Sequence, residues 1–374
     1  MEGLHGRQND FMAFSSLSSV VEKAPPIVWI APQASIAAAC ELMKAHHFLS
    51  LPIYDEVKRR ILGLVDILDV CAYLCWGTMH FFSENTEAQS DRELKAKMSE
   101  VAIVEVLNAK PQHGRPSLVV KRHLEPVCSL LDQMAQGLHR ALVRVWPETE
   151  EEEKEGSQRL EYYRMAAQID VVRFLVDHRR NLNYHLITSN ITALDMVGPA
   201  PAPAPVSTSS PPSTTQSAVR TLIYSVEEGR TALEAFRTLA LSGVHAIGII
   251  GVGSTGQGRL LYNLSASDLR GITPDTVHLL REPVEVYLER VQESAPTSRP
   301  RNLVTCTPDA TLIEVMELVL RSRVHRVWVI DQQQRPLGLI TLTDILSKFA
   351  SFDYARAQAA ATKTIVPLSL SSPH

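Results

Sequence analysis

The sequence predicts an α/β protein built from four copies of one helix–strand–strand–helix unit, arranged as two pairs. The clearest copy lies within residues 311–350, where the apolar spacing changes from helical to strand-like and back. A second observation is spacing, because Ser35 to Asp69 spans 34 positions and Thr311 to Asp344 spans 33. The third is a linker at residues 198–217, rich in Pro, Ala, Ser and Thr, which cannot build a core and separates the copies two and two.

The fourth copy, residues 302–350, sets the pattern for the others. Its first helix begins with a capping box, in which the Thr311 hydroxyl and the Glu314 carboxylate can each satisfy a free backbone N–H group. The apolar face of this helix consists of Leu312, Val315, Met316, Val319 and Leu320. Residues 327–330 and 337–340 are predicted strands joined by a polar turn, and the second helix is predicted at residues 345–349.

The other three copies repeat this order with differences in their loops. The first occupies residues 27–80, with predicted strands at 49–54 and 61–65. The second occupies residues 111–180 and contains an acidic insert at 147–157, which we interpret as a solvated loop. The third occupies residues 218–272, has a second capping box from Thr231 to Glu234, and has predicted strands at 246–250 and 259–264.

Three further segments lie outside the copies. Residues 1–26 form a leader, in which we expect a short helix at residues 11–21 packed beside the first copy. Residues 77–110 connect the first two copies and are expected to be partly helical. Residues 351–374 are expected to form a flexible tail.

Composition limits the function classes. The chain has 374 residues, of which 45% are apolar and 21% charged, with a net charge of −4. This charge gives no general attraction to nucleic acid or to an anionic membrane, so an anion site must be local. The longest apolar stretch, residues 61–76, is too short to span a membrane and contains Asp66 and Asp69. Five scattered cysteines and no secretory signal favour a reduced, cytoplasmic protein, with the nucleus as a second compartment.

The order of elements, with His325-Arg326 before one strand and Gly-Leu-Ile-Thr-Leu-Thr-Asp at 338–344 after the next, resembles a cystathionine-β-synthase (CBS) repeat. Among CBS proteins, it is most similar to the last repeat of the γ regulatory subunit of AMP-activated, sucrose-non-fermenting type protein kinases. The resemblance implies four CBS repeats in two paired (Bateman) modules. It also implies adenosine nucleotides (AMP, ADP or ATP) as regulatory ligands, and kinase catalytic and scaffold subunits as partners.

Four aspartates at the strand exits are the main candidates for ligand binding. They occupy the same position in each copy: Asp69, Asp170, Asp268 and Asp344. A carboxylate in the first turn of a helix can accept two hydrogen bonds, which suits the paired hydroxyls of a ribose. In nucleotide-binding CBS modules this position contacts ribose, and the resemblance carries that role to Asp344 and Asp268. The alternative is that each aspartate only caps its helix.

The residues around these aspartates differ between copies. The fourth copy has Thr341 and Thr343, and the third has Ser265 and Ser267, whose hydroxyls could reach a base or a phosphate. At the position of Thr341 the first copy has Asp66, which would repel phosphate, and the second has Ala167. The C-terminal half is therefore the better predicted nucleotide site.

Basic residues at the helix-to-strand turns are candidate phosphate ligands. His139-Arg140 and His325-Arg326 occupy this position in two copies, and the resemblance implies that such pairs contact phosphates. Arginine suits this role because its planar fork forms charge-assisted, often bidentate bonds. The third copy has His245 followed by Ala246, and the first has Leu49 where a basic residue is expected. A solvated surface arginine is the alternative, and Arg290 is a weaker additional candidate.

Other chemistry is not supported by the sequence. Residues 251–256 spell G-x-G-x-x-G, but a strand rather than a helix is predicted to follow, so we interpret them as a hairpin and not as a dinucleotide site. Cys71 and Cys75 lie on an apolar helix without a second ligand pair, so no metal site is predicted. With no catalytic constellation, we expect a nucleotide-sensing regulatory subunit and not an enzyme. The alternative is a CBS-fold interaction scaffold that binds no nucleotide.

Overall fold

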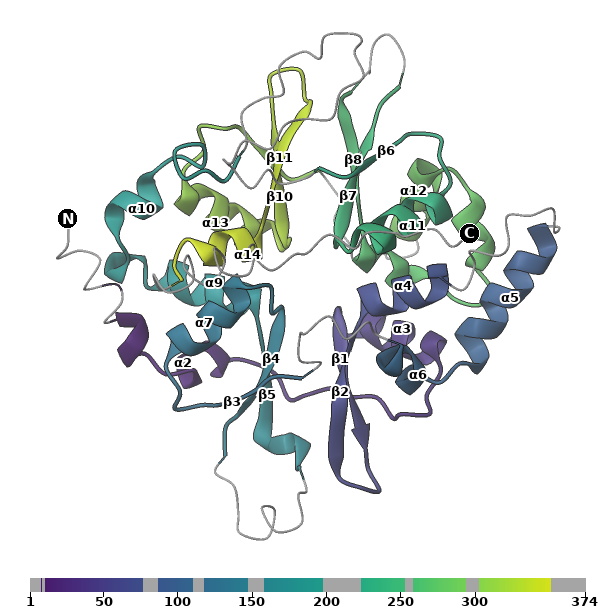
Figure 1. Ribbon diagram of the computed structural model, residues 1–374, viewed down its shortest axis with the longest axis horizontal. Coiled ribbons are helices and arrows are strands. Elements are labelled where there is room, and N and C mark those ends of the chain that lie inside the picture. The colour runs from purple at the N-terminus through teal and green to yellow at the C-terminus, as the bar shows by residue number, and fades with distance from the viewer. Residues whose placement is uncertain are drawn as a thin grey trace, which may run out of the picture.

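The computed structural model describes residues 8, 11–76, 87–109, 118–146, 158–197, 223–252, 258–293 and 303–350. The proposed linker at 198–217, the acidic insert at 147–157 and the tail at 351–374 lie outside these residues. The described residues form a mixed α/β fold with small sheets and helices, as Figure 1 shows. The predicted fold class, four CBS-like repeats in an α/β protein, is confirmed.

The first two repeats contain the predicted helices and strands. The elements of the first repeat are α3 (Ile36–Ala45), β1 (Ser50–Asp55), β2 (Arg60–Asp66) and α4 (Ile67–Trp76). Those of the second are β3 (Val120–Arg122), α7 (Val127–Ala135), β4 (Arg140–Arg144), β5 (Tyr163–Ala167) and α9 (Gln168–Asp177). Between them lie α5 (Glu87–Glu100) and α6 (Ile103–Asn108), so the prediction of a partly helical connector is confirmed.

The third and fourth repeats have the same order. The third consists of β6 (Ser225–Glu227), α11 (Ala232–Ser242), β7 (Ala246–Ile250), β8 (Leu260–Ser265) and the 3₁₀ helix η3 (Ala266–Gly271). The fourth consists of β9 (Thr305–Cys306), α13 (Leu312–Ser322), β10 (Arg326–Ile330), β11 (Pro336–Thr341) and α14 (Leu342–Ser347). The predicted capping boxes form at the starts of α11 and α13. Shorter elements lie between the repeats: η1 (Leu160–Tyr162), η2 (Arg179–Asn181), α10 (Tyr184–Thr188), η4 (Val277–Arg281) and α12 (Val284–Glu293).

A short strand that the sequence did not indicate precedes the first helix in three repeats. β3, β6 and β9 pair in parallel with β4, β7 and β10. In the first repeat, a single parallel bridge between Ile30 and Ile53 takes this place. These strands have two or three residues and are only partly buried, so they are too short for an alternating pattern to stand out.

The repeats pack through their sheets in one direction and through their helices in the other. The sheets of the first and second repeats meet at a small cluster that contains Tyr54, Ile61, Leu142 and Tyr163. The sheets of the third and fourth meet where Trp328 Nε1 donates to Asn263 Oδ1 at 3.0 Å. Helices of the first repeat pack on those of the third, and helices of the second pack on those of the fourth, giving two large apolar cores.

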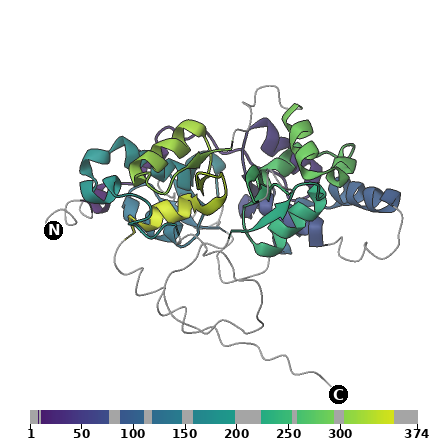
Figure 2. The ribbon, with the colours of Figure 1, turned by 90° about the horizontal axis from the view of Figure 1, so that it is seen from above.

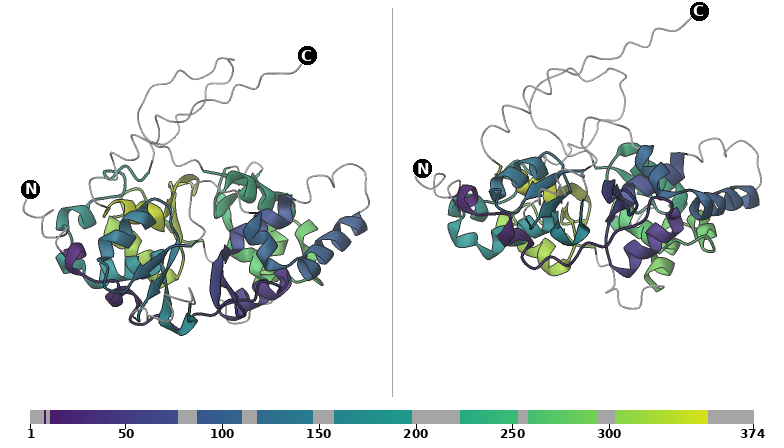
Figure 3. Two further views of the ribbon diagram at one scale, coloured as in Figure 1. Left: turned by 60° about the horizontal axis from the view of Figure 1, so that its bottom comes forward. Right: turned by 90° about the horizontal axis from the view of Figure 1, so that it is seen from below.

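This packing produces a flat molecule with the sheets in the middle. Figure 1 shows the strands along the centre line and the helices on the two outer sides. The views in Figure 2 and Figure 3 show that the two helical sides lie next to each other in a flattened body. Each half of the chain therefore contributes one repeat to each helical core.

The leader packs in a different place from the one expected. Its short helix α2 (Ser18–Val21) and the residues before it lie against the second repeat, not the first. The backbone N–H groups of Leu17 and Ser18 donate to the carbonyls of Glu125 and His123 at 2.9 Å each, and Phe11 stacks on Phe174. The expectation was wrong because proximity in sequence does not decide which core accepts the apolar face of a short segment.

Candidate functional site

The ends of the four hairpins have equivalent geometry. The residue before the first strand accepts a backbone hydrogen bond from the residue that follows the second strand. The four pairs are Leu49 with Ile67, His139 with Gln168, His245 with Ala266, and His325 with Leu342, at 2.9–3.2 Å. The strand registers agree, since the terminal pairs are Ser50 with Asp66, Arg140 with Ala167, Ala246 with Ser265, and Arg326 with Thr341. Equivalent side chains of all four repeats therefore occupy equivalent positions.

The four strand-exit aspartates cap the helices that follow them. In each case one carboxylate oxygen accepts the backbone N–H group three residues earlier, at 2.7–2.9 Å, in Asp69, Asp170, Asp268 and Asp344. The second oxygen of Asp170 accepts from Arg173, whereas within the described residues that of Asp344 accepts no hydrogen bond. Capping thus uses one oxygen of each aspartate, and it does not by itself decide between a capping role and a ribose-binding role.

Six basic side chains gather where the hairpin ends meet, and we call them the central cationic cluster. Its members are His139, Arg140, His245, Arg270, His325 and Arg326, from the second, third and fourth repeats. The rings of His139 and His245 lie 4.4 Å apart between centroids. Arg326 Nη1 donates to the His245 carbonyl at 2.9 Å. Figure 1 shows that the strands of all four sheets point toward the centre of the molecule.

Two further residues connect the repeats at this junction, and sequence reasoning missed both: Arg270 and Gln168. Arg270 Nη1 donates to the Phe48 carbonyl of the first repeat at 3.0 Å, and Arg270 Nε donates to the Ser267 carbonyl at 3.1 Å. Gln168, which is 5% exposed, donates to Thr343 Oγ1 of the fourth repeat at 2.8 Å. Arg270 could have been found by its position two residues after the candidate Asp268. Comparison of the repeats did not reveal it, because no other repeat has an arginine at this position.

Burial and mutual repulsion change the electrostatics of the cluster. Burial, with further contributions from Arg140, Arg326, Arg270 and His245, lowers the pKa of His325 to about 3, so this side chain is neutral near pH 7. Burial also lowers the pKa of Arg326 to about 10 and lowers the pKa of Arg140 and of Arg270. All three guanidinium groups remain charged at neutral pH, and an anion among them would relieve their repulsion.

Two carboxylates lie near this cluster. Asp66 and Asp170 both favour the charged form of Arg140 and so oppose the effect of burial on the pKa of that arginine. Asp66 belongs to the first repeat, and its Oδ1 also accepts the backbone N–H of Asp69 at 2.9 Å. The first repeat therefore contributes a negative charge at the junction where the other three contribute positive ones.

The predicted hydroxyls already take part in internal hydrogen bonds. Thr341 Oγ1 donates to Asp344 at 2.7 Å, and Ser265 Oγ bonds Ser267 Oγ and Asp268. Thr343 Oγ1 accepts from Gln168 and keeps its own proton for another acceptor. The weaker candidate Arg290 lies exposed on α12.

The other motifs have structural explanations. A strand, β8, and not a helix follows the glycine-rich segment, and the Gly258 N–H donates to the Gly251 carbonyl as in a hairpin. Cys71 and Cys75 are buried in the core shared by the first and third repeats. Among the described residues, no group of three or more His, Cys, Asp and Glu side chains is arranged to hold a metal ion. No helix in the described part of the chain is long and apolar enough to cross a membrane.

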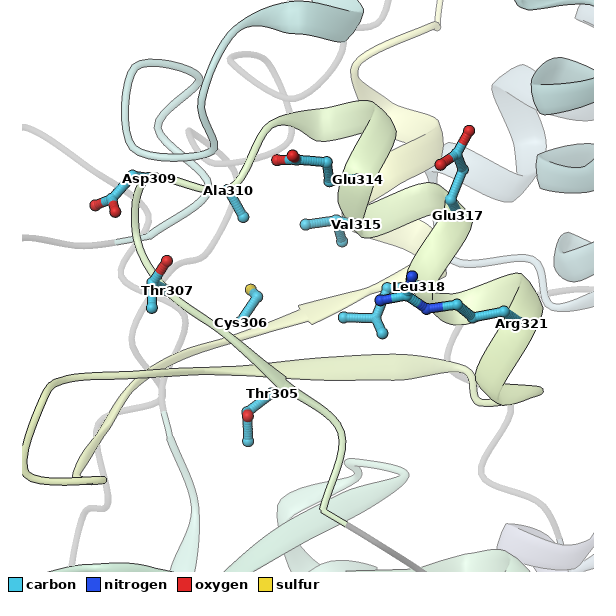
Figure 4. Close-up of a pocket in the computed structure, with 10 residues that line it drawn as sticks. All are labelled: Thr305, Cys306, Thr307, Asp309, Ala310, Glu314, Val315, Glu317, Leu318 and Arg321. Carbon is cyan, nitrogen blue, oxygen red and sulfur yellow. The ribbon is translucent and has the colours of Figure 1, made fainter.

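A surface pocket of about 500 Å³ lies elsewhere, beside β9 and α13 of the fourth repeat. Figure 4 shows that the carboxylates of Asp309, Glu314 and Glu317 and the guanidinium of Arg321 surround it, with Cys306 on the strand side. None of the predicted site residues lines this pocket. Its mixed charge does not identify a ligand.

Comparison with known proteins identifies the repeats. The model of the CBS domain matches residues 18–75 and 299–351, which include most of the first repeat and all of the fourth. A solved structure, protein MJ1225 from Methanocaldococcus jannaschii, matches 90% of this chain and 100% of its own, with a TM-score of 0.59 and 15% identity. At this identity the likeness shows the fold alone.

Two curated relatives are γ-type subunits of protein kinases. The SNF1-related protein kinase regulatory subunit gamma-like PV42b of Arabidopsis thaliana is 26% identical over 313 residues, covering 78% of this chain and 76% of the relative. The 5'-AMP-activated protein kinase subunit gamma-3 of Sus scrofa is 32% identical over 75 residues, which is 19% of this chain and 15% of the relative. The predicted resemblance to γ-type kinase subunits is confirmed.

Proposed function

The chain contains CBS domains and resembles γ-type regulatory subunits of SNF1-related and AMP-activated kinases, and from this premise we propose that it is an adenine-nucleotide-binding regulatory subunit. In this proposal AMP, ADP or ATP is a regulatory ligand, and the chain itself catalyses no reaction. Its partners are the catalytic and scaffold subunits of a kinase of that type, in the cytoplasm and the nucleus.

The observation that carries the proposal is the central cationic cluster. Three arginines and three histidines from three repeats meet at one point of a chain whose net charge is −4. These cations are partly buried, and partly buried cations without a bound anion are costly. Guanidinium groups match phosphate oxygens in charge and in geometry. A phosphate at this junction would receive charge-assisted hydrogen bonds from side chains that are now close to one another.

The strand-exit aspartates supply the second half of the proposed site. Asp344 has one carboxylate oxygen engaged in capping and a second that accepts no hydrogen bond within the described residues. That oxygen is available to ribose hydroxyls. We therefore propose that the ribose binds at Asp344, and at Asp268 in the third repeat, with the phosphates directed to the cluster.

A ligand at this junction can act on the whole molecule. The cluster includes side chains of both halves of the chain, for example His139 of the first half and His245 of the second. A ligand that binds one arrangement of the halves more tightly shifts the population toward it, and by linkage changes the affinity for a partner by the same free energy. Signal transmission thus requires only that the partner also distinguishes the two arrangements.

Calorimetric titration with AMP, ADP and ATP tests the proposal. Micromolar binding corresponds to about −8 kcal/mol, and Arg326→Gln is expected to weaken it at least about tenfold because a charge-assisted contact is lost. Asp344→Asn keeps an oxygen for capping and is expected to weaken binding less. Arg335→Gln is the matched control, because Arg335 pairs with Asp331 in the exposed turn of the same hairpin. Thermal melts establish that each variant is folded.

An interaction scaffold without nucleotide binding is the competing function. It is favoured by the capping bonds of all four aspartates, which give these residues a structural role. Absence of heat with all three nucleotides, from protein shown to be folded, would support the scaffold. Affinity purification followed by identification of SNF1-type kinase subunits tests the partner separately from the ligand.

A further inference from the structure

The first repeat has a carboxylate where the other repeats have none. Asp66 ends β2 and occupies the position of Ala167, Ser265 and Thr341 in the other three repeats. On the neighbouring strand, Ser50 stands where the second and fourth repeats have Arg140 and Arg326. At these two positions, the first repeat therefore contributes one negative charge, that of Asp66, and no positive charge to the junction.

The carboxylate of Asp66 acts on the cluster through Arg140. Both residues lie at the cluster end of their hairpins, and the sheets of these hairpins pack against each other through Tyr54, Ile61, Leu142 and Tyr163. Among the neighbouring charged groups, Asp66 favours the charged form of Arg140 most strongly, and Asp170 favours it next. Arg140 is thus stabilised by carboxylates of the protein, while Arg326 Nη1 donates to the neutral carbonyl of His245.

We propose that Asp66 is a selectivity determinant that restricts the central cationic cluster to ligands with a single phosphoryl group, nucleoside monophosphates in preference to triphosphates. This inference rests on the proposed function and specifies its ligand class. Asp66 does so as a fixed negative charge that attracts Arg140 and repels the additional phosphates of a longer chain.

The charges at the junction are consistent with a preference for ligands that have one phosphoryl group. The cluster contains three guanidinium groups, and two carboxylates, Asp66 and Asp170, act on one of them, Arg140. His325 is neutral near pH 7. The excess positive charge is small, so it suits one phosphate better than three. For a ligand charge about 8 Å from Asp66, at an effective dielectric constant of about 20, repulsion lowers affinity on the order of thirtyfold per unit charge. Each further phosphoryl group adds at least one such charge.

The sequence of the other repeats supplies a substitution that removes the charge and keeps the fold. Asp66 also caps α4, because its Oδ1 accepts the Asp69 N–H at 2.9 Å. Serine is an equally good capping residue and is present at this position in the third repeat, as Ser265. Asp66→Ser and Asp66→Asn both keep an oxygen for the cap while deleting the negative charge.

The experiment compares dissociation constants for AMP and ATP by calorimetry, without Mg²⁺, at fixed ionic strength and pH 7.5. Wild-type protein is expected to bind AMP more tightly than ATP. In Asp66→Ser and Asp66→Asn the ratio of ATP affinity to AMP affinity should rise about tenfold or more. The matched control is Asp55→Asn, which removes the same charge from the far end of β1, where Asp55 accepts from the N–H groups of Val57 and Lys58.

Each outcome has a defined meaning. An affinity ratio that is unchanged in both Asp66 variants, or that changes equally in Asp55→Asn, overturns the selectivity role and leaves nucleotide binding intact. A wild-type preference for ATP over AMP also overturns it. If folded wild-type protein binds neither nucleotide, the proposed function and this inference fail together. Agreement of the Ser and Asn variants excludes a change specific to one side chain.

Discussion

At the centre of the molecule, His325 shares its surroundings with Arg140, Arg270 and Arg326 and with His245. Each of these groups disfavours protonation of the His325 ring, and burial disfavours it most strongly. A neutral imidazole beside three guanidinium groups can still donate one hydrogen bond and accept another, but it adds no charge to the cluster. Its protonation state is therefore the most sensitive local reporter of the cluster's charge.

We expect His325 to make the stability of the ligand-free protein depend on pH. The folded pKa is about 3 and the ordinary value is 6.5, so between these values the unfolded chain binds a proton that the folded chain does not. Stability therefore falls as pH falls through this window, by at most about 1.4 kcal/mol per pH unit. Urea unfolding at pH 7, 6 and 5, in buffer without phosphate, should give a smaller slope for His325→Gln than for wild type.

The control for this measurement is His278→Gln. His278 is exposed on η4 and is not a member of the central cationic cluster, and its substitution removes the same kind of side chain. Titrating carboxylates contribute to all three proteins alike and cancel in the comparison. Equal slopes for wild type and His325→Gln would show that His325 is not held in its neutral form.

At the scale of elements, the contact between the third and fourth sheets depends on a missing side chain. Gly248 lies in β7, and a Cβ atom there would come within 2.8 Å of Leu260 Cδ1 and 3.1 Å of Trp328. The indole of Trp328 is 2% exposed and donates to Asn263 from the opposing position. Glycine thus lets the largest side chain of this interface lie flat against β7.

Gly248→Ala is expected to destabilise the protein by about 1–3 kcal/mol, because the added methyl group overpacks this interface. Chemical denaturation measures the loss. Leu260→Val shortens the side chain that the methyl group would meet, so the double variant should lose less stability than the sum of the two single variants. Additive losses would mean that the contact with Leu260 is not the cause.

At the scale of the whole molecule, the two halves of the chain are interlocked. The core of the first and third repeats and the core of the second and fourth repeats each combine helices from both sides of the 198–222 segment. Cys71 of the first half donates to the Phe236 carbonyl of the second, and Phe236 is fully buried against Tyr287. Neither half can bury its helical faces alone.

Residues 11–197 and 223–350, expressed separately, are therefore expected to expose apolar surface and to bind a hydrophobic dye or self-associate. Co-expressed, they should form a 1:1 complex with the thermal stability of the intact chain. The intact chain cut at a protease site engineered between residues 198 and 217 serves as the control and should remain assembled on gel filtration. A half that is monomeric, cooperative in unfolding and free of bound dye would contradict the interlocked arrangement.

Local features of the fold followed from the sequence. Capping boxes at Thr311 and Thr231, helical apolar faces and paired strand patterns depend on residues within a few positions of one another, so they can be recognised without a structure. The repeated order of helix and strands then placed Asp69, Asp170, Asp268 and Asp344 in one register. The short strands β3, β6 and β9 were not predicted from the sequence, because they form only by pairing with a strand that is distant in sequence.

Much less of the site could be predicted. The sequence named His139, Arg140, His245, His325 and Arg326, but their meeting at one point depends on how four hairpin ends converge. It missed Arg270, whose hydrogen bond to Phe48 joins two repeats. It also could not give the low pKa of His325, which results first from burial and then from charges on three different repeats. Whether these residues bind a nucleotide stays a prediction.

The sequence by itself determined the repeated unit, its helix caps and the number of its copies, because these depend on short-range spacing and hydrogen bonding. Only the tertiary structure decided that helices of the first repeat pack on the third and those of the second on the fourth, and that the leader lies on the second repeat. It also decided that Asp66 lies near enough to Arg140 to favour its charged form. Such long-range contacts depend on which apolar surfaces fit together, and no local pattern encodes that choice.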